Sequence, residues 1–124
     1  MPDSKSEPGT IVWRDLTVPD ADSTQKFYSE VVGWRGRAEA DCDGDFNMLT
    51  PSGQTAAGIC YARGINANLP PQWLIYIAVA DVEKSAARCL ELGGKIIHGP
   101  RKLGAKNFCV IQDPAGAVAA LIDV

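Results

Sequence analysis

The chain has 124 residues, of which 46% are hydrophobic and 22% are charged, and its formal net charge at pH 7 is −3. This composition is ordinary for one globular domain and argues against a disordered chain. The negative charge argues against a nucleic-acid partner, because phosphate backbones are bound by a clustered excess of Lys and Arg. The one short basic cluster, Arg101, Lys102 and Lys106, is interrupted by Gly104, which favours a solvated loop.

Targeting and membrane signals are absent from the sequence pattern. No run approaches the roughly 18 apolar residues that a membrane helix needs, and residues 1–9 lack the apolar centre of a signal peptide. We therefore expect no membrane partner, a cytoplasmic protein, and a disordered or frayed tail over residues 1–9. Small buried thiols without disulfides are expected at the cysteines, which have no Cys-x-x-Cys spacing: Cys42, Cys60, Cys89 and Cys109.

Residues 10–61 predict a first module with the element order βαβββ. The segment from Ile11 to Val18 alternates and is rich in β-forming residues, which predicts a strand. Asp20 suits the N-cap of the helix that follows, and Gly33 suits its C-terminal end. Three short strands are expected next, at residues 34–39, 45–50 and 54–61.

Residues 72–124 predict a second module of the same design within one domain. The polar segment 62–71 ends in two prolines and is predicted to be a linker. An apolar strand over residues 73–80 leads to Asp81, which suits a second helix N-cap. Gly93 and Gly94 end that helix, and a tight turn covers Asp113 to Gly116. Strands are expected near residues 95–98, 106–113 and 117–123.

The two modules share their internal spacing. Asp20 is followed by Gly33 thirteen residues later, and Asp81 is followed by Gly94 at the same distance. A repeated unit of this length is one supersecondary module used twice. The predicted fold class is therefore α+β, with two βαβββ modules.

The repeated motifs also carry a resemblance to a known family. They are Val18-Pro19-Asp20, Phe27-Tyr28, Val32-Gly33-Trp34, Val79-Ala80-Asp81, Leu92-Gly93-Gly94 and Asp113-Pro114-Ala115-Gly116. In order and spacing they resemble the glyoxalase/bleomycin-resistance/dioxygenase group, the vicinal oxygen chelate superfamily. The resemblance implies curved mixed sheets around a cup, often completed by a second subunit, and a divalent metal held by two side chains from each module.

The positions that the resemblance assigns to metal ligands do not carry donors here. In the family these are usually a His five positions before the Val of the Val-x-Asp motif, and a Glu four positions after the turn glycine. The corresponding residues are Trp13, Leu74, Ala57 and Ala120. A two-His-one-carboxylate site also needs two histidines, whereas this chain has one. We therefore expect no metal and no other cofactor.

Strand alternation indicates which side chains face the predicted cup. If the turn from Asp113 to Gly116 is a simple four-residue hairpin, Cys109 lies opposite Ala120 and faces the cup with it. The same reasoning places two residues of the first module near Ala57. The candidate ligand-binding residues are Trp13, Asp15, Phe46, Met48, Leu74, Tyr76, Cys109 and Ala120.

Trp13, Asp15, Cys109 and His98 also have a plainer structural interpretation. Trp13 could stack on a planar ligand, but an apolar Trp on a strand is commonly part of the core. Asp15 could bind a ligand or face water at an edge. For Cys109, packing is favoured over a nucleophilic role, and for His98 a solvated loop is favoured over acid–base chemistry.

Three functions remain open from the sequence. The leading hypothesis is a metal-independent protein that binds a small, partly aromatic compound in the cup. The second is a lyase, isomerase or dioxygenase-like enzyme that uses Asp15, Tyr76 or His98 as acid–base groups, or unusual metal ligands. The third is a degenerate subunit that dimerises and regulates. A C2 homodimer is expected in every case.

Overall fold

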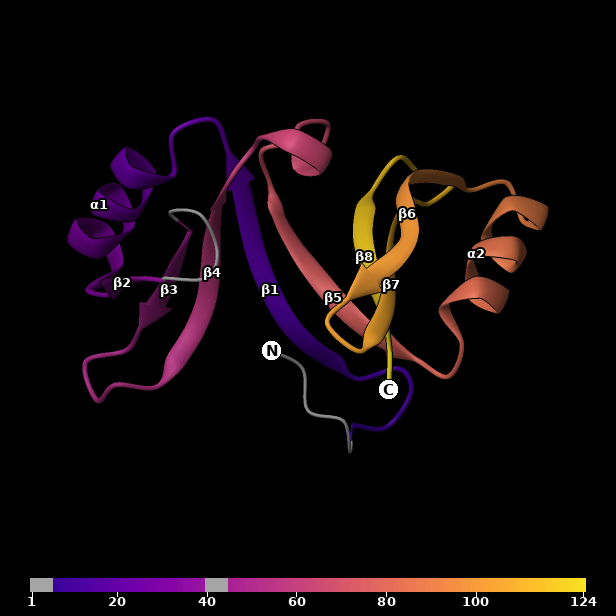
Figure 1. Cartoon of the computed structure of the whole chain (residues 1–124), viewed down its shortest axis with the longest axis horizontal. Helices are drawn as coiled ribbons and strands as arrows, with labels where there is room; N and C mark the ends of the chain where they lie inside the picture. The colour runs from indigo at the N-terminus through magenta and orange to yellow at the C-terminus, as the bar shows by residue number, and fades with distance from the viewer. Residues whose placement is uncertain (1–5, 40–44) are drawn as a thin grey trace. The chain divides into compact units, whose positions relative to one another are not determined.

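The computed structural model describes residues 6–39 and 45–124, which divide into two compact units (Figure 1). The α1 unit comprises Arg14–Trp73. The α2 unit comprises Met1–Trp13 together with Leu74–Val124. Strand β1 therefore begins in the α2 unit and continues in the α1 unit.

The α1 unit has a mixed sheet and one α-helix in its described residues. Its strands follow the order β2-β3-β4-β1. Strands β1 and β4 are parallel, and the other neighbouring pairs are antiparallel. The elements are β1 (Ile11–Val18), α1 (Ala21–Val32), β2 (Arg35–Ala38), β3 (Phe46–Leu49), β4 (Thr55–Tyr61) and the short 3-10 helix η1 (Gly64–Asn66).

The α2 unit repeats this arrangement in its own described residues. Its strands follow the order β5-β8-β7-β6, with β5 and β8 parallel and the other pairs antiparallel. The elements are β5 (Trp73–Val79), α2 (Val82–Glu91), β6 (Lys95–Leu103), β7 (Lys106–Gln112) and β8 (Val118–Asp123). The predicted α+β class with two βαβββ modules in mixed sheets is confirmed.

Both helices begin where the capping pattern predicts. The Asp20 carboxylate accepts a hydrogen bond of 3.0 Å from the Ser23 backbone N–H, which lowers the pKa of that carboxyl group. Asp81 accepts the equivalent bond from Lys84 at 3.2 Å. Helix α1 ends at Gly33, whose φ of 88° lies in the left-handed region that favours glycine.

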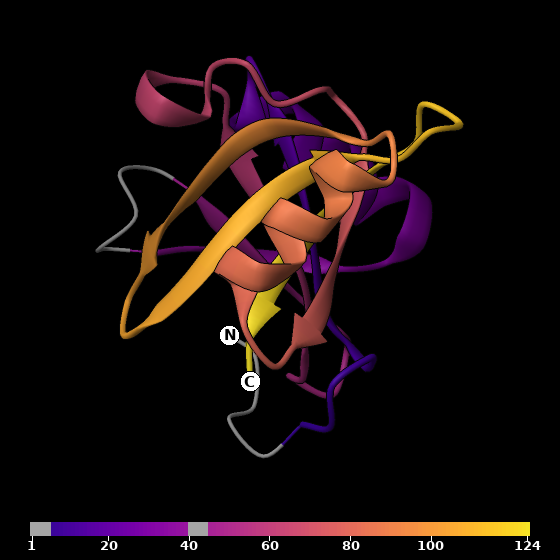
Figure 2. The ribbon, with the colours of Figure 1, turned by 90° about the vertical axis from the view of Figure 1, so that its right-hand side faces the viewer.

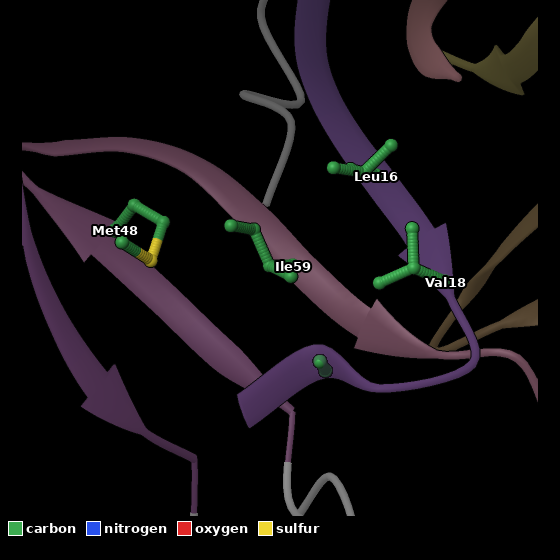
Figure 3. Close-up of a cluster of buried hydrophobic side chains, with 5 residues drawn as sticks. Leu16, Val18, Met48 and Ile59 are labelled. Carbon is green, nitrogen blue, oxygen red and sulfur yellow. The ribbon is translucent and has the colours of Figure 1, made fainter. Parts of the chain in front are cut away.

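The core of the α1 unit lies between helix α1 and one face of its sheet. Met48 and Ile59 are fully buried there, together with Leu16, Val18 and Ala21. Figure 3 shows the labelled side chains of this cluster, which come from β1, β3 and β4. The strand residues alternate, so that one side chain in two points toward α1.

The core of the α2 unit is built in the same way. Helix α2 packs against β7 and β8 (Figure 2). Its Val82 and Ala86 contact Cys109 of β7 and Leu121 of β8 in a buried cluster. Neither helix in the described part of the chain is long and apolar enough to cross a membrane.

Strand β6 is longer than the sequence predicts. The expected strand ended at His98, and Arg101 and Lys102 were expected in a solvated loop, but β6 continues to Leu103. The register of β6 with β7 shifts between His98 and Arg101, and the strand continues through Gly99 and Pro100 at this shift. Proline is tolerated at this point since β6 is the last strand in the order of its unit.

Three further predictions concern Cys42, the N-terminal tail and the linker. Cys42 lies outside the described residues, as do residues 1–5 of the predicted tail. The tail's last residue, Gly9, donates a hydrogen bond of 2.7 Å to the Ala78 carbonyl of β5. The segment 62–71, predicted to be a linker, contains η1.

We expect Ile59→Ala to lower the free energy of unfolding by about 2–5 kcal/mol, because Ile59 is fully buried and the deletion leaves a cavity. Urea denaturation followed by far-UV circular dichroism measures this change. The matched control is Ile11→Ala, since Ile11 is 51% exposed. That variant should stay within about 0.5 kcal/mol of the parent protein. Equal effects of the two substitutions would contradict the assignment of this core.

Candidate functional site

The sheet of the α2 unit has a second face, directed away from helix α2. Cys109 and Leu121 point toward α2, so the residues on either side of them point the other way. Register pairs Tyr76 with Ala120 and Phe108 with Ile122. We call this surface the α2-distal face; its residues are each no more than 6% exposed: Leu74, Tyr76, Phe108, Val110, Ala120 and Ile122.

An aromatic stack lies at the centre of the α2-distal face. The rings of Tyr76 and Phe108 are stacked, with centroids 6.4 Å apart and planes inclined by 22°. The His98 ring lies 5.5 Å from Phe108, and the Arg101 guanidinium carbon lies 4.8 Å from the Phe108 centroid. Phe108 thus contacts an aromatic ring, an imidazole and a cation at once.

His98 and Arg101 are joined by a hydrogen bond. The Arg101 Nε–H donates to His98 Nε2 at 2.7 Å, which requires that this imidazole nitrogen carries a lone pair. Burial lowers the pKa of His98, and the positive charge of Arg101 lowers it further. At neutral pH His98 is therefore a neutral imidazole with its proton on Nδ1. The prediction of a solvated loop histidine is wrong, because His98 is part of β6 and packs on Phe108.

A bulge in β6 brings His98 and Arg101 to the same side of the strand. In a regular strand, residues three positions apart point to opposite faces. Gly99 has φ of 83°, and a Cβ atom there would lie 2.8 Å from the Phe108 carbonyl oxygen, so this close approach requires glycine. A Gly-Pro pair next to a short predicted strand is the signal from which this bulge could have been anticipated.

Three of the predicted ligand-binding residues lie together on the α2-distal face. Leu74 and Ala120 are fully buried there, beside Tyr76. Their apolar or aromatic side chains make this face rich in hydrocarbon and poor in polar groups. Their role in ligand binding stays a prediction.

The predicted orientation of Cys109 is wrong. Cys109 pairs with Leu121 and packs under α2, and burial raises the pKa of its thiol to about 11. The Asp113 N–H donates to the Ala117 carbonyl at 2.8 Å, so the hairpin closes one residue later than predicted. A shift of one residue turns every side chain of a strand to its other face.

The predicted orientation of Phe46 and Met48 is also wrong. Met48 does lie opposite Ala57, as predicted. Leu16 and Ile59 pair in the parallel ladder, however, and both lie on the face covered by α1. Ala57 lies two residues before Ile59, so its side chain is on the same face. Phe46 packs against the same buried cluster as Met48. The two side chains therefore belong to the core of the α1 unit.

The remaining two candidates lie on β1. Trp13 is half-buried at the end of the first segment of the α2 unit. Asp15 is half-buried in the α1 unit, where its backbone pairs with Gly58. Ligand binding by either residue stays a prediction.

The residues at the family's metal positions do not fit a metal ion. Leu74 and Ala120 present hydrocarbon to the α2-distal face, and Trp13 and Ala57 likewise carry no side-chain lone pair suited to a divalent cation. Among residues 6–39 and 45–124, no three His, Cys, Asp or Glu side chains gather closely enough to hold a metal.

The two βαβββ modules place the chain in a known class of fold. The family model of the Glyoxalase/Bleomycin resistance protein/Dioxygenase superfamily matches residues 10–121. The chain belongs to this superfamily, and the predicted resemblance is confirmed.

Two curated relatives are identical to this chain at 28% of the aligned positions. It is 28% identical over 118 residues to CFP32 of Mycobacterium tuberculosis, provisionally named a glyoxylase, covering 94% of this chain and 45% of that protein. It is 28% identical over 128 residues to the anthracycline biosynthesis protein DnrV of Streptomyces peucetius, covering 92% of this chain and 46% of that protein. The chain thus spans about half the length of these relatives.

Solved structures show the same fold at low sequence identity. One is a superfamily member from Vibrio splendidus 12B01, with a TM-score of 0.55 and 15% identity, covering 90% of this chain and 97% of that chain. Another is a Streptomyces coelicolor methylmalonyl-CoA epimerase in complex with 2-nitronate-propionyl-CoA, with a TM-score of 0.54 and 16% identity, covering 94% and 98%. These likenesses bear on the fold alone.

We expect Arg101→Gln to raise the pKa of His98 toward its ordinary value, because the substitution removes a positive charge that opposes the imidazolium form. A proton NMR titration measures this directly, since His98 is the only histidine of the chain. The matched control is Lys102→Gln, which removes an exposed positive charge from the same strand and should leave the pKa of His98 unchanged. An unchanged or lower pKa in Arg101→Gln would show that the two side chains do not interact in solution.

Proposed function

We propose that this chain is a metal-independent protein that binds a small, partly aromatic compound. The observation that carries the proposal is the composition of the α2-distal face. Hydrocarbon stands at Leu74 and Ala120, where the family resemblance expects metal ligands, next to the stacked rings of Tyr76 and Phe108. A face of this composition favours flat, apolar ligand groups over metal coordination.

The names of two similar proteins mention small organic compounds. DnrV is described as an anthracycline biosynthesis protein, and the Streptomyces coelicolor epimerase is seen with 2-nitronate-propionyl-CoA. The chain spans about half of DnrV and differs from the epimerase at most positions, so the ligand of neither protein is transferred to this chain. The aromatic part of the proposal rests on Phe108 and Tyr76.

An enzymatic function is the second candidate, and His98 is the observation that favours it. Its imidazole is half-buried and neutral at neutral pH because its pKa is lowered, and its Nε2 lone pair would serve as a base once Arg101 releases it. A lyase or isomerase would need such a group near its substrate. Turnover of a compound that is lost in His98→Gln while binding of that compound is kept would favour an enzyme over a binding protein.

We further propose that the protein acts as a homodimer in the cytoplasm. Helix α1 exposes Phe27 and Val31 by 58% and 64%, which leaves apolar surface available to a second copy. Cys89 and Cys109 form no disulfide, as is usual in a reducing compartment. Sedimentation velocity is expected to give twice the mass of one chain, and a monomer at all concentrations would contradict the dimer.

We expect ligand binding to persist after exhaustive dialysis against EDTA, because the proposed site uses no metal. The probe is 2-naphthamide, a neutral aromatic compound, and the measurement is the shift of backbone amide signals at Tyr76, Phe108 and Ala120. The dissociation constant should be the same before and after dialysis. Stoichiometric nickel, zinc, iron or manganese in the purified protein, with loss of binding on its removal, would contradict the proposal.

A further inference from the structure

The contact between His98 and Arg101 exists in one protonation state only. Arg101 donates its Nε–H to His98 Nε2 at 2.7 Å, so Nε2 must carry a lone pair. A proton on Nε2 would bring two N–H donors, each on a cation, to the same short distance. The hydrogen bond is therefore lost when His98 takes up a proton.

The same hydrogen bond holds Arg101 over the ring of Phe108. The guanidinium carbon lies 4.8 Å from the ring centroid, and the His98 ring lies 5.5 Å from it. The Nη1–H of Arg101 donates to the carbonyl of Lys102 at 3.1 Å, but this partner is the next residue of the same strand and does not tie Arg101 to β7. We call the His98–Arg101 hydrogen bond, with its guanidinium over Phe108, the latch.

The charged side chains that β6 and β7 place beside Phe108 are positive. By alternation, Lys106 lies on the same side of β7 as Phe108, and its buried Nζ atom has no hydrogen-bond partner among the described residues. Within residues 6–39 and 45–124, no carboxylate forms an ion pair with His98, Arg101 or Lys106. A proton on His98 would thus add positive charge that no ion pair in this part of the chain compensates.

The other two strands of the α2 unit bring no carboxylate to this face. Strand β5 places the Tyr76 phenol against Phe108, and β8 places Ala120 and Ile122 there. Asp123 of β8 alternates to the side of helix α2, where its carboxylate accepts two backbone N–H hydrogen bonds of 2.8 and 3.1 Å. Its negative charge therefore does not stabilise an imidazolium on the opposite face.

Repulsion between the two cations outweighs the contact that would keep Arg101 in place. Unit charges a few ångströms apart in a partly buried site repel more strongly than a cation–π contact attracts. Arginine keeps its proton throughout the pH range in which histidine titrates, so the guanidinium relieves the repulsion by moving. Arg101 is half-buried, and a side chain of this length reaches water by changing rotamer.

We propose that protonation of His98 releases Arg101 from Phe108, so that acid opens the latch and uncovers one side of the Phe108 ring. With the latch closed, Phe108 is only 3% exposed, so this face of the sheet is shut at neutral pH. The inference goes beyond the proposed small-molecule function and does not depend on it, because Arg101 is expected to move whether or not a ligand binds.

The latch opens at mildly acidic pH. Burial lowers the pKa of His98 below its ordinary value of 6.5, and Arg101 lowers it further. As the pH falls, the unfolded chain therefore binds the proton before the folded protein does. The contribution of the latch to stability is complete above pH 6.5 and is lost as the pH falls through the lower pKa of the folded protein.

Proton NMR on the full chain tests the latch. At neutral pH the Phe108 ring should shift the side-chain signals of Arg101 upfield, and a neutral gadolinium chelate in solution should relax the Phe108 ring protons only weakly. On acidification the upfield shift should be lost and the relaxation should increase, both with the midpoint of the His98 imidazole titration. Arg101 signals that stay upfield while His98 titrates would overturn the proposal.

His98→Gln is the matched variant that cannot titrate. Its amide oxygen still accepts from the Arg101 Nε–H, so the Arg101 signals should stay upfield from neutral pH to about pH 5. Lys102→Gln, which removes an exposed positive charge from the same strand, should keep the transition of the parent protein. The same transition in His98→Gln would assign it to another group and contradict the latch. Coincidence of the midpoints in the parent protein tests the proposal even if His98→Gln does not fold.

Discussion

The candidate site of this chain depends on one geometric constraint. Side chains alternate along each strand, and a helix covers only one face of the sheet. Helix α2 buries Cys109 and Leu121, which forces their neighbours on β7 and β8 to the other face. Phe108 and Ala120 reach the α2-distal face for this reason alone. The register of a single hairpin therefore decides which residues are available to a ligand.

On the α2-distal face, hydrocarbon side chains stand at positions where the family resemblance expects metal ligands. Leu74 and Ala120 supply no donors, so a ligand cannot be oriented there by coordination. Positive charge is present nonetheless, in Arg101 and in the buried ammonium of Lys106. Side-chain cations differ from a divalent ion because they cannot be removed by a chelator and they direct their hydrogen bonds. The proposed binding should therefore tolerate metal depletion, whereas the position of Arg101 should respond to pH.

More of the fold than of the candidate site could be predicted from the sequence. The caps Asp20 and Asp81, and the equal spacing to Gly33 and Gly94, are local signals that need no tertiary information. The direction in which a strand side chain points is harder to predict, because it depends on the number of residues in the preceding or following turn. The turn after Asp113 is one residue longer than a simple hairpin, and that single residue reversed the predicted orientation of Cys109.

His98 and Arg101 illustrate the second limit of reasoning from the sequence. A Gly-Pro pair between them suggested the end of a strand, whereas the strand bulges and continues. The same bulge is what lets two residues three positions apart share one face and bond to each other at 2.7 Å. A regular strand would have separated them, so the irregularity that the sequence pattern did not reveal is also what brings His98 and Arg101 together. Bulges are frequent beside binding sites for this reason, since they redirect a side chain without a change in fold.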